Sequence, residues 1–229
     1  MATGGLDIEC QVQSLAVDRL VSAALQASTA KLASPGIGQI TGLALDHHSS
    51  KLYAFHRSGN TFFSTARIAE ASILAFSLDG KLRGTFARNV FLVPHGLSID
   101  HRRRLWATDV ALHQVMRIDP SRDIVELTIG AGVAGHSPSH FNKPTDVAVH
   151  PVTEEVFVAD GYGNSRVAVY SYTGEYLREF GSAGSADGQF RVPHSLVIDK
   201  RGYLYVADRE NSRVQVRNPS CLLSRCSRL

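Results

Sequence analysis

A repeat of about fifty residues runs through most of this 229-residue chain and limits its possible folds more than any other feature. Pro94, Pro144 and Pro193 open successive copies, and an earlier copy without the proline begins at Ile40. Each copy continues as an apolar strand, a short turn and a second apolar strand. The opening segments are 40–46, 94–100, 144–150 and 193–199, and the second strands are 52–55, 105–109, 156–160 and 204–208. Short apolar runs separated by Asp, Gly and Asn turns are typical of hairpins. The repeat therefore predicts an all-β fold.

Three or four strands in each copy describe one blade of a β-propeller better than half of a sandwich. In the last two copies a third strand follows an Asn-Ser-Arg turn, at 166–170 and 213–216. We expect about four blades over residues 39–216. Residues 1–38 form a lead-in with some helical character, and residues 217–229 are a tail without the repeat.

Charge and cysteine content exclude several classes of function. A net charge of +3 is too small to indicate nucleic acid or an acidic membrane as a partner, and the one basic cluster, His101–Arg104, is expected at a hairpin tip. Cys10, Cys221 and Cys226 lie outside the repeats, so they form no disulfide framework or CxxC zinc site there. The N-terminus lacks the order of a signal peptide, and no segment is apolar for long enough to span a bilayer.

Positions that depart from the repeat are informative because the fold alone does not require them. The residue after the opening position alternates: Thr41, His95, Thr145, His194. The first strand of each blade lies nearest the propeller axis, so histidines from alternate blades of a six-bladed ring point at one spot. Three imidazoles and a water are a standard catalytic zinc arrangement. We therefore predict a metal here, with a third histidine from blade six. The alternative is a pair of polar histidines that line a channel.

Two further departures fall in the loops after the second strands. His56 replaces the aspartate that ends this strand in the other copies, and Arg57 follows it. Tyr162 lies between two glycines, in a loop one residue longer than that of the fourth copy. Arg57 and Tyr162 are candidate functional residues, whereas a surface arginine and ordinary turn chemistry are the alternatives.

The segments that contain these departures resemble, in order, the peptidyl-α-hydroxyglycine α-amidating lyases. They are Phe55-His56-Arg57 and residues 93–100, 108–115, 140–149, 160–166 and 192–196. The likeness runs from about Gln39 to Val216. It implies a six-bladed NHL-repeat propeller that performs the second step of peptide C-terminal amidation. In that step a peptidyl-α-hydroxyglycine is split into the peptide amide and glyoxylate.

The resemblance also implies roles for individual residues. His95 and His194 are similar to two of the family's three zinc ligands, Tyr162 to its catalytic tyrosine, and Arg57 to its active-site arginine. Zinc would lower the pKa of the substrate hydroxyl, as it does for water. A tyrosine held beside cations is suited to act as the general base.

The same resemblance implies a structural calcium, partners and a location. The backbone carbonyls of Leu43 and Leu97 correspond to two positions that hold calcium on the axis. The substrate would be a glycine-extended, α-hydroxylated peptide in neuropeptide processing, in the secretory pathway or outside the cell. The copper monooxygenase that precedes this lyase in bifunctional relatives has no counterpart in these 229 residues.

The chain departs from the family pattern in two ways. The third zinc histidine and the calcium aspartate would fall in blade six, so we expect a C-terminally truncated copy that is either inactive or dependent on another chain for the missing blades. The family's two disulfides would join positions 142 and 163 and positions 205 and 216, which here are Asn142, Gly163, Tyr205 and Val216. A non-catalytic NHL propeller that serves as a protein-binding platform is the alternative. A calcium-dependent propeller hydrolase would need axial carboxylates, against which the histidines argue.

Overall fold

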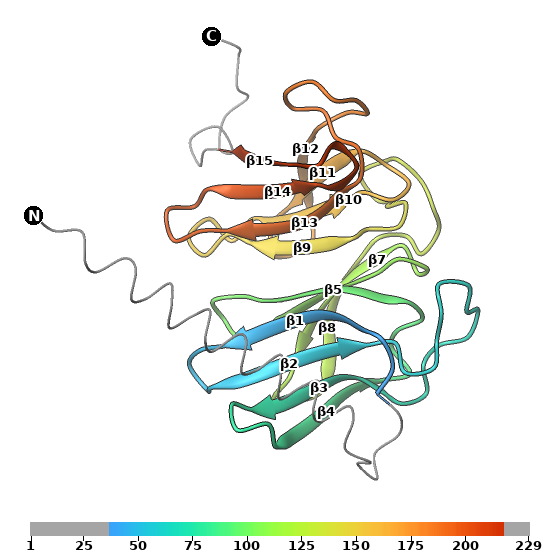
Figure 1. Ribbon diagram of the computed structural model, residues 1–229, viewed down its shortest axis with the longest axis vertical. Helices are drawn as coiled ribbons and strands as arrows, with labels where there is room; N and C mark the ends of the chain where they lie inside the picture. Colours follow the sequence, from blue (N-terminus) through green and yellow to red (C-terminus); the bar gives the residue numbers. More distant parts are fainter. Residues whose placement is uncertain (1–36, 218–229) are drawn as a thin grey trace, which may run out of the picture.

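The computed structural model describes residues 37–217, and these form four antiparallel sheets in succession along the chain (Figure 1). The first sheet contains β1 (Ile40–Asp46), β2 (Lys51–His56), β3 (Ala71–Ser77) and β4 (Leu82–Arg88). The second contains β5 (Pro94–Ile99), β6 (Leu105–Asp109), β7 (Gln114–Asp119) and β8 (Ile124–Ile129). The third contains β9 (Asp146–Val149), β10 (Val156–Asp160), β11 (Arg166–Tyr170) and β12 (Tyr176–Phe180). The fourth contains β13 (Pro193–Ile198), β14 (Leu204–Asp208) and β15 (Arg213–Arg217), with one 3-10 turn at Arg209–Asn211.

Each sheet is a meander whose neighbours in space are neighbours in sequence, which confirms the predicted all-β propeller of four blades. The first strands β1, β5, β9 and β13 lie side by side, so they line the inner face of the arc (Figure 1). The predicted helical lead-in and the tail fall almost entirely outside the described residues and stay predictions. Within residues 37–217 there is no helix with the length and apolar character needed to cross a lipid bilayer.

Three apolar layers, one between each pair of successive blades, form most of the core, and a smaller cluster lies in the first blade. Successive side chains on a strand point to opposite faces, and both faces of an inner blade are covered, so its middle strands are mostly apolar. All five residues of β10 are buried for this reason. Phe55 packs edge-on against Phe91 between the first two blades, with ring centroids 4.6 Å apart. Trp106 lies between the second and third blades and is fully buried.

The recurring aspartate at the end of the second strand closes the second, third and fourth blades. Asp109 accepts hydrogen bonds from the backbone N–H groups of Leu92 and Val93 at 2.6 and 2.9 Å. Asp160 and Asp208 accept equivalent bonds from the segments before β9 and β13. A buried carboxylate is stable only when donors satisfy its oxygens, which these backbone groups do. The basic cluster His101–Arg104 lies at a turn as expected, and Glu154 pairs with both His101 and Arg102.

The positions at which the family's cysteines would pair are neighbours. Tyr205 and Val216 are directly opposite each other in the β14–β15 ladder. The N–H of Gly163 donates to the carbonyl of Asn142 at 2.9 Å, and a Cβ at Gly163 would lie only 2.1 Å from the Asn142 side chain. A cross-strand side-chain pair, Tyr205 and Val216, therefore stands where one disulfide would be, and the backbone hydrogen bond between Gly163 and Asn142 stands where the other would be.

Replacing Arg166 tests the buried ion pair of the third blade. Its Nε donates to Asp160 at 3.0 Å and a terminal nitrogen donates to the carbonyl of His140 at 2.6 Å, with only 1% of the arginine side chain exposed. Because Arg166→Met leaves the buried Asp160 charge without this partner, we expect it to lower the free energy of unfolding by about 3–5 kcal/mol, measured by urea denaturation.

Arg213→Met in the fourth blade is the matched control. Its Nε donates to Asp208 at 2.9 Å, and Asn211 donates to Asp208 at 2.8 Å as Asn164 does to Asp160 at 2.7 Å, but the side chain of Arg213 is 27% exposed. We therefore expect a smaller loss of stability. Equal losses in the two variants would contradict the assigned importance of burial.

Candidate active site

β-Bulges place the two predicted histidines. In the β5–β6 pair, Pro94 faces Asp109 and Leu97 faces Ala107, so His95 and Gly96 share a single partner residue. In the β13–β14 pair the same irregularity leaves His194 as the extra residue. A bulge re-aims a side chain that a regular ladder would direct to one face of the sheet. Both imidazoles therefore leave the blade packing and turn toward a common point.

Tyr162 lies between the two histidines. Its hydroxyl oxygen is 3.0 Å from His95 Nε2 and 3.1 Å from His194 Nε2, and the two imidazole centroids are 4.9 Å apart. The loop after β10 carries Tyr162 to this point by passing close to β13. A Cβ at Gly161 would lie 2.1 Å from the carbonyl oxygen of Pro193, so only glycine permits the approach. The structure thus brings together three of the four predicted catalytic and zinc residues.

The hydrogen bonds fix which ring nitrogens carry protons. His95 Nδ1 is 2.7 Å from the carbonyl oxygen of Thr145, which can only accept. Nδ1 of the neutral ring is therefore the donor, and Nε2 accepts from the Tyr162 hydroxyl. The phenol oxygen in turn accepts from His194 Nε2, while Nδ1 of His194 is 3.3 Å from the Ser195 hydroxyl. The two histidines are held in opposite tautomers, and only His95 has a buried partner.

Burial keeps both imidazoles neutral. Burial is the main cause that lowers the pKa of His95 to about 4; the hydrogen bond to the Thr145 carbonyl opposes the shift, and the charges of His194, Arg57 and Arg209 add to it. Burial followed by the charge of Arg209 lowers the pKa of His194 as well. Neutral imidazole is the form that binds metal ions, so His95 presents a free Nε2 lone pair at neutral pH, and His194 presents one once its proton moves from Nε2 to Nδ1.

The depressed pKa of His95 makes stability depend on pH. The unfolded chain takes up this proton near 6.5 and the folded chain only near 4, so between these values the unfolded state binds more protons. Stability from this residue is therefore lost as the pH falls from 6.5 to 4. We expect the stability advantage of wild type over His95→Gln to shrink by about 3 kcal/mol across that window in chelator-treated protein. Urea denaturation at each pH measures it, and a constant difference would contradict a neutral His95.

Arg57 and an aromatic side chain flank the tyrosine. The Arg57 guanidinium is buried, donates to the carbonyl of Pro94 and to the side chain of Gln39, both at 3.0 Å, and lies 5.5 Å from the Phe62 ring centroid. Phe62 meets the edge of Tyr162 with centroids 5.7 Å apart. The loop from β2 to β3 that carries Phe62 extends beyond the strand ends at the right in Figure 1. Arg57 therefore lies beside the histidine–tyrosine cluster without touching the tyrosine hydroxyl.

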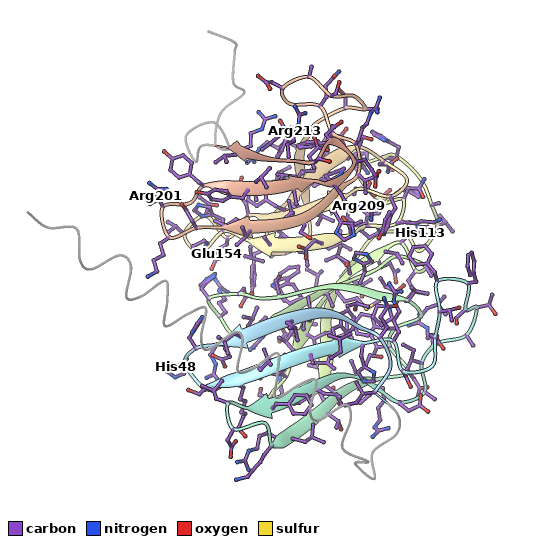
Figure 2. All side chains as sticks on the ribbon, viewed as in Figure 1. His48, His113, Glu154, Arg201, Arg209 and Arg213 are labelled. Carbon is purple, nitrogen blue, oxygen red and sulfur yellow. The ribbon has the colours of Figure 1, made fainter. Side chains whose placement is uncertain are left out.

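Arg209 also contacts the tyrosine, and the sequence analysis missed it. Its guanidinium carbon lies 5.3 Å from the Tyr162 ring centroid, and a terminal nitrogen is 3.5 Å from the hydroxyl. Figure 2 shows Arg209 and His113 at one end of the blades, opposite Arg201, Glu154 and His48. A signal was available, because Arg57 and Arg209 both follow the residue that ends a second strand, in the first and fourth repeats.

His95 and His194 line a small axial cavity of about 210 Å³. Leu43 and Leu97, whose carbonyls were predicted to hold calcium, both line it together with Asp146. The Asp146 carboxylate accepts from the N–H groups of Val147 and Leu196, each at 2.9 Å, and burial raises its pKa to about 7. Asp146 is an oxygen donor that the sequence analysis did not select. Among residues 37–217 no group of three or more His, Cys, Asp or Glu side chains is arranged to hold a metal ion.

The chain is similar to known proteins over most of its length. The NHL repeat family matches residues 141–170 and 190–216. Peptidylglycine alpha-amidating monooxygenase of Rattus norvegicus is 42% identical over 206 residues, covering 79% of this chain and 21% of that protein. A probable peptidyl-alpha-hydroxyglycine alpha-amidating lyase of Caenorhabditis elegans is 37% identical, covering 80% and 56%. The chain thus spans about a fifth to about half of the length of these relatives.

Solved structures of low sequence identity share the fold. A nidogen in complex with laminin superposes with a TM-score of 0.59 at 21% identity, covering 79% of this chain and 61% of that one. A streptogramin B lyase superposes with a TM-score of 0.58 at 10% identity, covering 82% of this chain and 54% of that one.

A further sequence relative, peptidyl-alpha-hydroxyglycine alpha-amidating lyase 2 of Drosophila melanogaster, is 35% identical, covering 77% of this chain and 47% of that protein. From its repeats, its blades and these relatives, the chain belongs to the peptidyl-α-hydroxyglycine α-amidating lyase family of NHL-repeat β-propellers.

Proposed function

We propose that this chain provides the site that splits peptidyl-α-hydroxyglycine into a peptide amide and glyoxylate. The observation that carries the proposal is the Tyr162 hydroxyl within 3.0 and 3.1 Å of the Nε2 atoms of His95 and His194. A proton acceptor beside two neutral imidazoles suits a reaction that begins by removing a hydroxyl proton. Relatives that carry the name of this lyase support the same reaction.

The two imidazoles fit zinc as part of its ligand set. Both present Nε2 to a common point, both are neutral, and the Thr145 carbonyl already holds the Nδ1 proton of His95, which leaves its Nε2 free to ligate. His95 and His194 would hold the ion, and a third donor would come from outside residues 37–217. When bound, zinc supplies a Lewis acid that makes the substrate hydroxyl more acidic.

The residues of this chain then move one proton and orient the substrate. Tyr162 first gives up its own phenol proton to solvent, and its phenolate oxygen then accepts the proton of the substrate hydroxyl. The electrons of that O–H bond form the carbonyl of glyoxylate as the carbon–nitrogen bond breaks, and the departing amide nitrogen takes the proton. No oxidant or water is consumed, because the proton that leaves oxygen ends on nitrogen.

Two guanidinium groups suit the acidic end of this substrate. Arg209 is 45% exposed beside the tyrosine, so it can pair with the carboxylate of the hydroxyglycine, as arginine does with planar anions. Arg57 is held by two hydrogen bonds beside Phe62 and adds a fixed positive charge that favours the developing oxyanion. These roles place the cleaved bond next to Tyr162.

Calcium on the axis would be structural. The carbonyls of Leu43 and Leu97 would ligate it, because the cavity that both residues line is next to the histidine-bearing strands and calcium prefers oxygen donors. Asp146 lines the same cavity and can contribute charge. Such an ion would tie the inner strands together beneath the reacting groups.

The substrate would come from a monooxygenase that hydroxylates a glycine-extended peptide, since two relatives are named amidating monooxygenases. That substrate class goes with the secretory pathway or the extracellular space. A chain that supplies further blades is the other partner we propose, because residues 37–217 provide only two of the donors that a zinc site needs.

The test is release of glyoxylate and peptide amide in equal amounts from an N-acylated peptide that ends in α-hydroxyglycine, with zinc supplied. The same peptide ending in glycine is the control and should give no product. The spontaneous rate measured without protein is subtracted. Product formation at the spontaneous rate alone would overturn the proposal and leave a non-catalytic binding platform.

A further inference from the structure

Thr108 is a departure from the repeat that the proposed reaction does not use. The residue before the strand-ending position is Phe55, Ala159 and Ala207 in the other blades, so only the second blade has a hydroxyl there. The Thr108 side chain is completely buried. A buried hydroxyl requires partners, and Thr108 has two.

The first partner is the bulge that carries His95. The bulge leaves the N–H of Gly96 without a place in the β5–β6 ladder, and this N–H donates to the Thr108 hydroxyl at 2.8 Å. Gly96 has no side chain to keep the neighbouring blade away: a Cβ there would lie 2.6 Å from the Thr145 carbonyl oxygen. Thr108 therefore fixes the backbone directly after His95.

The second partner is the carbonyl that orients the His95 ring. The Thr108 hydroxyl donates to the Thr145 carbonyl at 3.1 Å, and the same oxygen accepts from His95 Nδ1 at 2.7 Å. A carbonyl oxygen has two lone pairs, so it can accept both bonds. One hydroxyl thus holds both the strand that carries the imidazole and the acceptor that receives its proton.

The surroundings of His194 differ from those of His95. Ala207 occupies the position of Thr108 in the fourth blade, and the Nδ1 atom of His194 meets only the Ser195 hydroxyl, at 3.3 Å. The ring of His194 is also less buried than that of His95. Thr145 belongs to the blade after the one that carries His95, whereas the fourth blade, which carries His194, is the last within residues 37–217.

We infer that Thr108 is a positioning residue that holds His95 in the Nδ1–H tautomer with its Nε2 lone pair directed at Tyr162. Partners of this kind orient a ligating imidazole and raise its affinity for metal. The consequence for zinc rests on the proposed function, whereas the tautomer does not.

The test uses the full chain with ¹⁵N-labelled histidine, treated with chelator and observed at about pH 8, where the rings are neutral. The His95 resonances, identified by their loss in His95→Gln, are expected to show a protonated Nδ1 and an unprotonated Nε2. Thr108→Val removes the hydroxyl and keeps the shape, and we expect averaged ring resonances. Thr108→Ser restores the hydroxyl and should restore the wild-type pattern.

Zinc affinity is the second readout. We expect the zinc Kd of Thr108→Val to rise by about 10–100-fold, and that of Thr108→Ser to stay near wild type. Backbone amide spectra check that each variant is folded. If the valine variant does not fold, the wild-type and serine spectra still decide the inference, because an Nε2–H tautomer or a mixture in either would overturn it.

The outcomes separate this inference from the proposed reaction. Unchanged His95 resonances and zinc affinity in folded Thr108→Val would overturn the positioning role even if the wild-type protein releases glyoxylate. Wild-type protein without lyase activity, whose His95 responds to Thr108→Val as expected, would overturn the reaction and leave the positioning role in place.

Discussion

Tyr162→Phe is expected to lower kcat for glyoxylate release by about 10²–10⁴-fold, the range that a general base typically contributes. The substitution removes one oxygen atom, the atom within 3.1 Å of both imidazole nitrogens, and leaves the ring. The ring keeps its edge-on contact with Phe62, so the loop that carries it should keep its position. Steady-state release of glyoxylate from a hydroxyglycine peptide measures the effect.

Zinc binding separates loss of the base from loss of the site. The ligating nitrogens of His95 and His194 are intact in Tyr162→Phe, so the zinc Kd should change little. Tyr176→Phe is a matched control, since that hydroxyl bonds Glu179 on the outer strand of the third blade and is remote from the histidines. Substantial turnover by Tyr162→Phe would refute the role of the phenol as base, and a loss of zinc would show that the phenol maintains the site.

The repeat made the fold and the three central residues predictable for one reason. Copies of one blade differ only where something other than packing selects the residue, so His95, His194 and the longer loop of Tyr162 were visible as departures. Their convergence also followed from the fold, because inner strands of successive blades are adjacent. The bulges that aim the two histidines were not predictable, because no residue in the sequence of β5 or β13 demands an extra residue in the strand.

Groups that act across blades were harder to predict. Arg209 reaches Tyr162 only because the third-blade loop passes within reach of the fourth blade, which depends on the close approach of Gly161 to the Pro193 carbonyl. The acceptor for His95 is the backbone carbonyl of Thr145. Every residue has a backbone carbonyl, so the sequence does not show which one accepts. In the sequence Asp146 is simply part of a predicted strand. Only the packing of the inner strands shows that its carboxylate accepts a hydrogen bond from the N–H of Leu196 in the next blade.

Removing either histidine tests the proposed metal site directly. We expect His95→Ala and His194→Ala each to weaken zinc binding by at least about 100-fold. Residues 37–217 supply only two ligating nitrogens, and each variant removes one of them. The double variant should lose little more than either single variant, since one imidazole alone no longer makes a site and the effects are not additive. His136→Ala is the matched control: that imidazole is exposed and bonds Asn164 and Glu179 away from Tyr162.

Glyoxylate release is expected to depend on bound zinc. Chelator treatment is expected to abolish glyoxylate release by the wild-type protein, and zinc should restore it while calcium alone should not, because calcium binds oxygen donors and not imidazole. The histidine variants should stay inactive at zinc concentrations that saturate wild type. If His95→Ala still binds one zinc ion with wild-type affinity, the imidazole pair is not the metal site. If chelator removes zinc but leaves turnover unchanged, the reaction depends on Tyr162 and the two arginines alone.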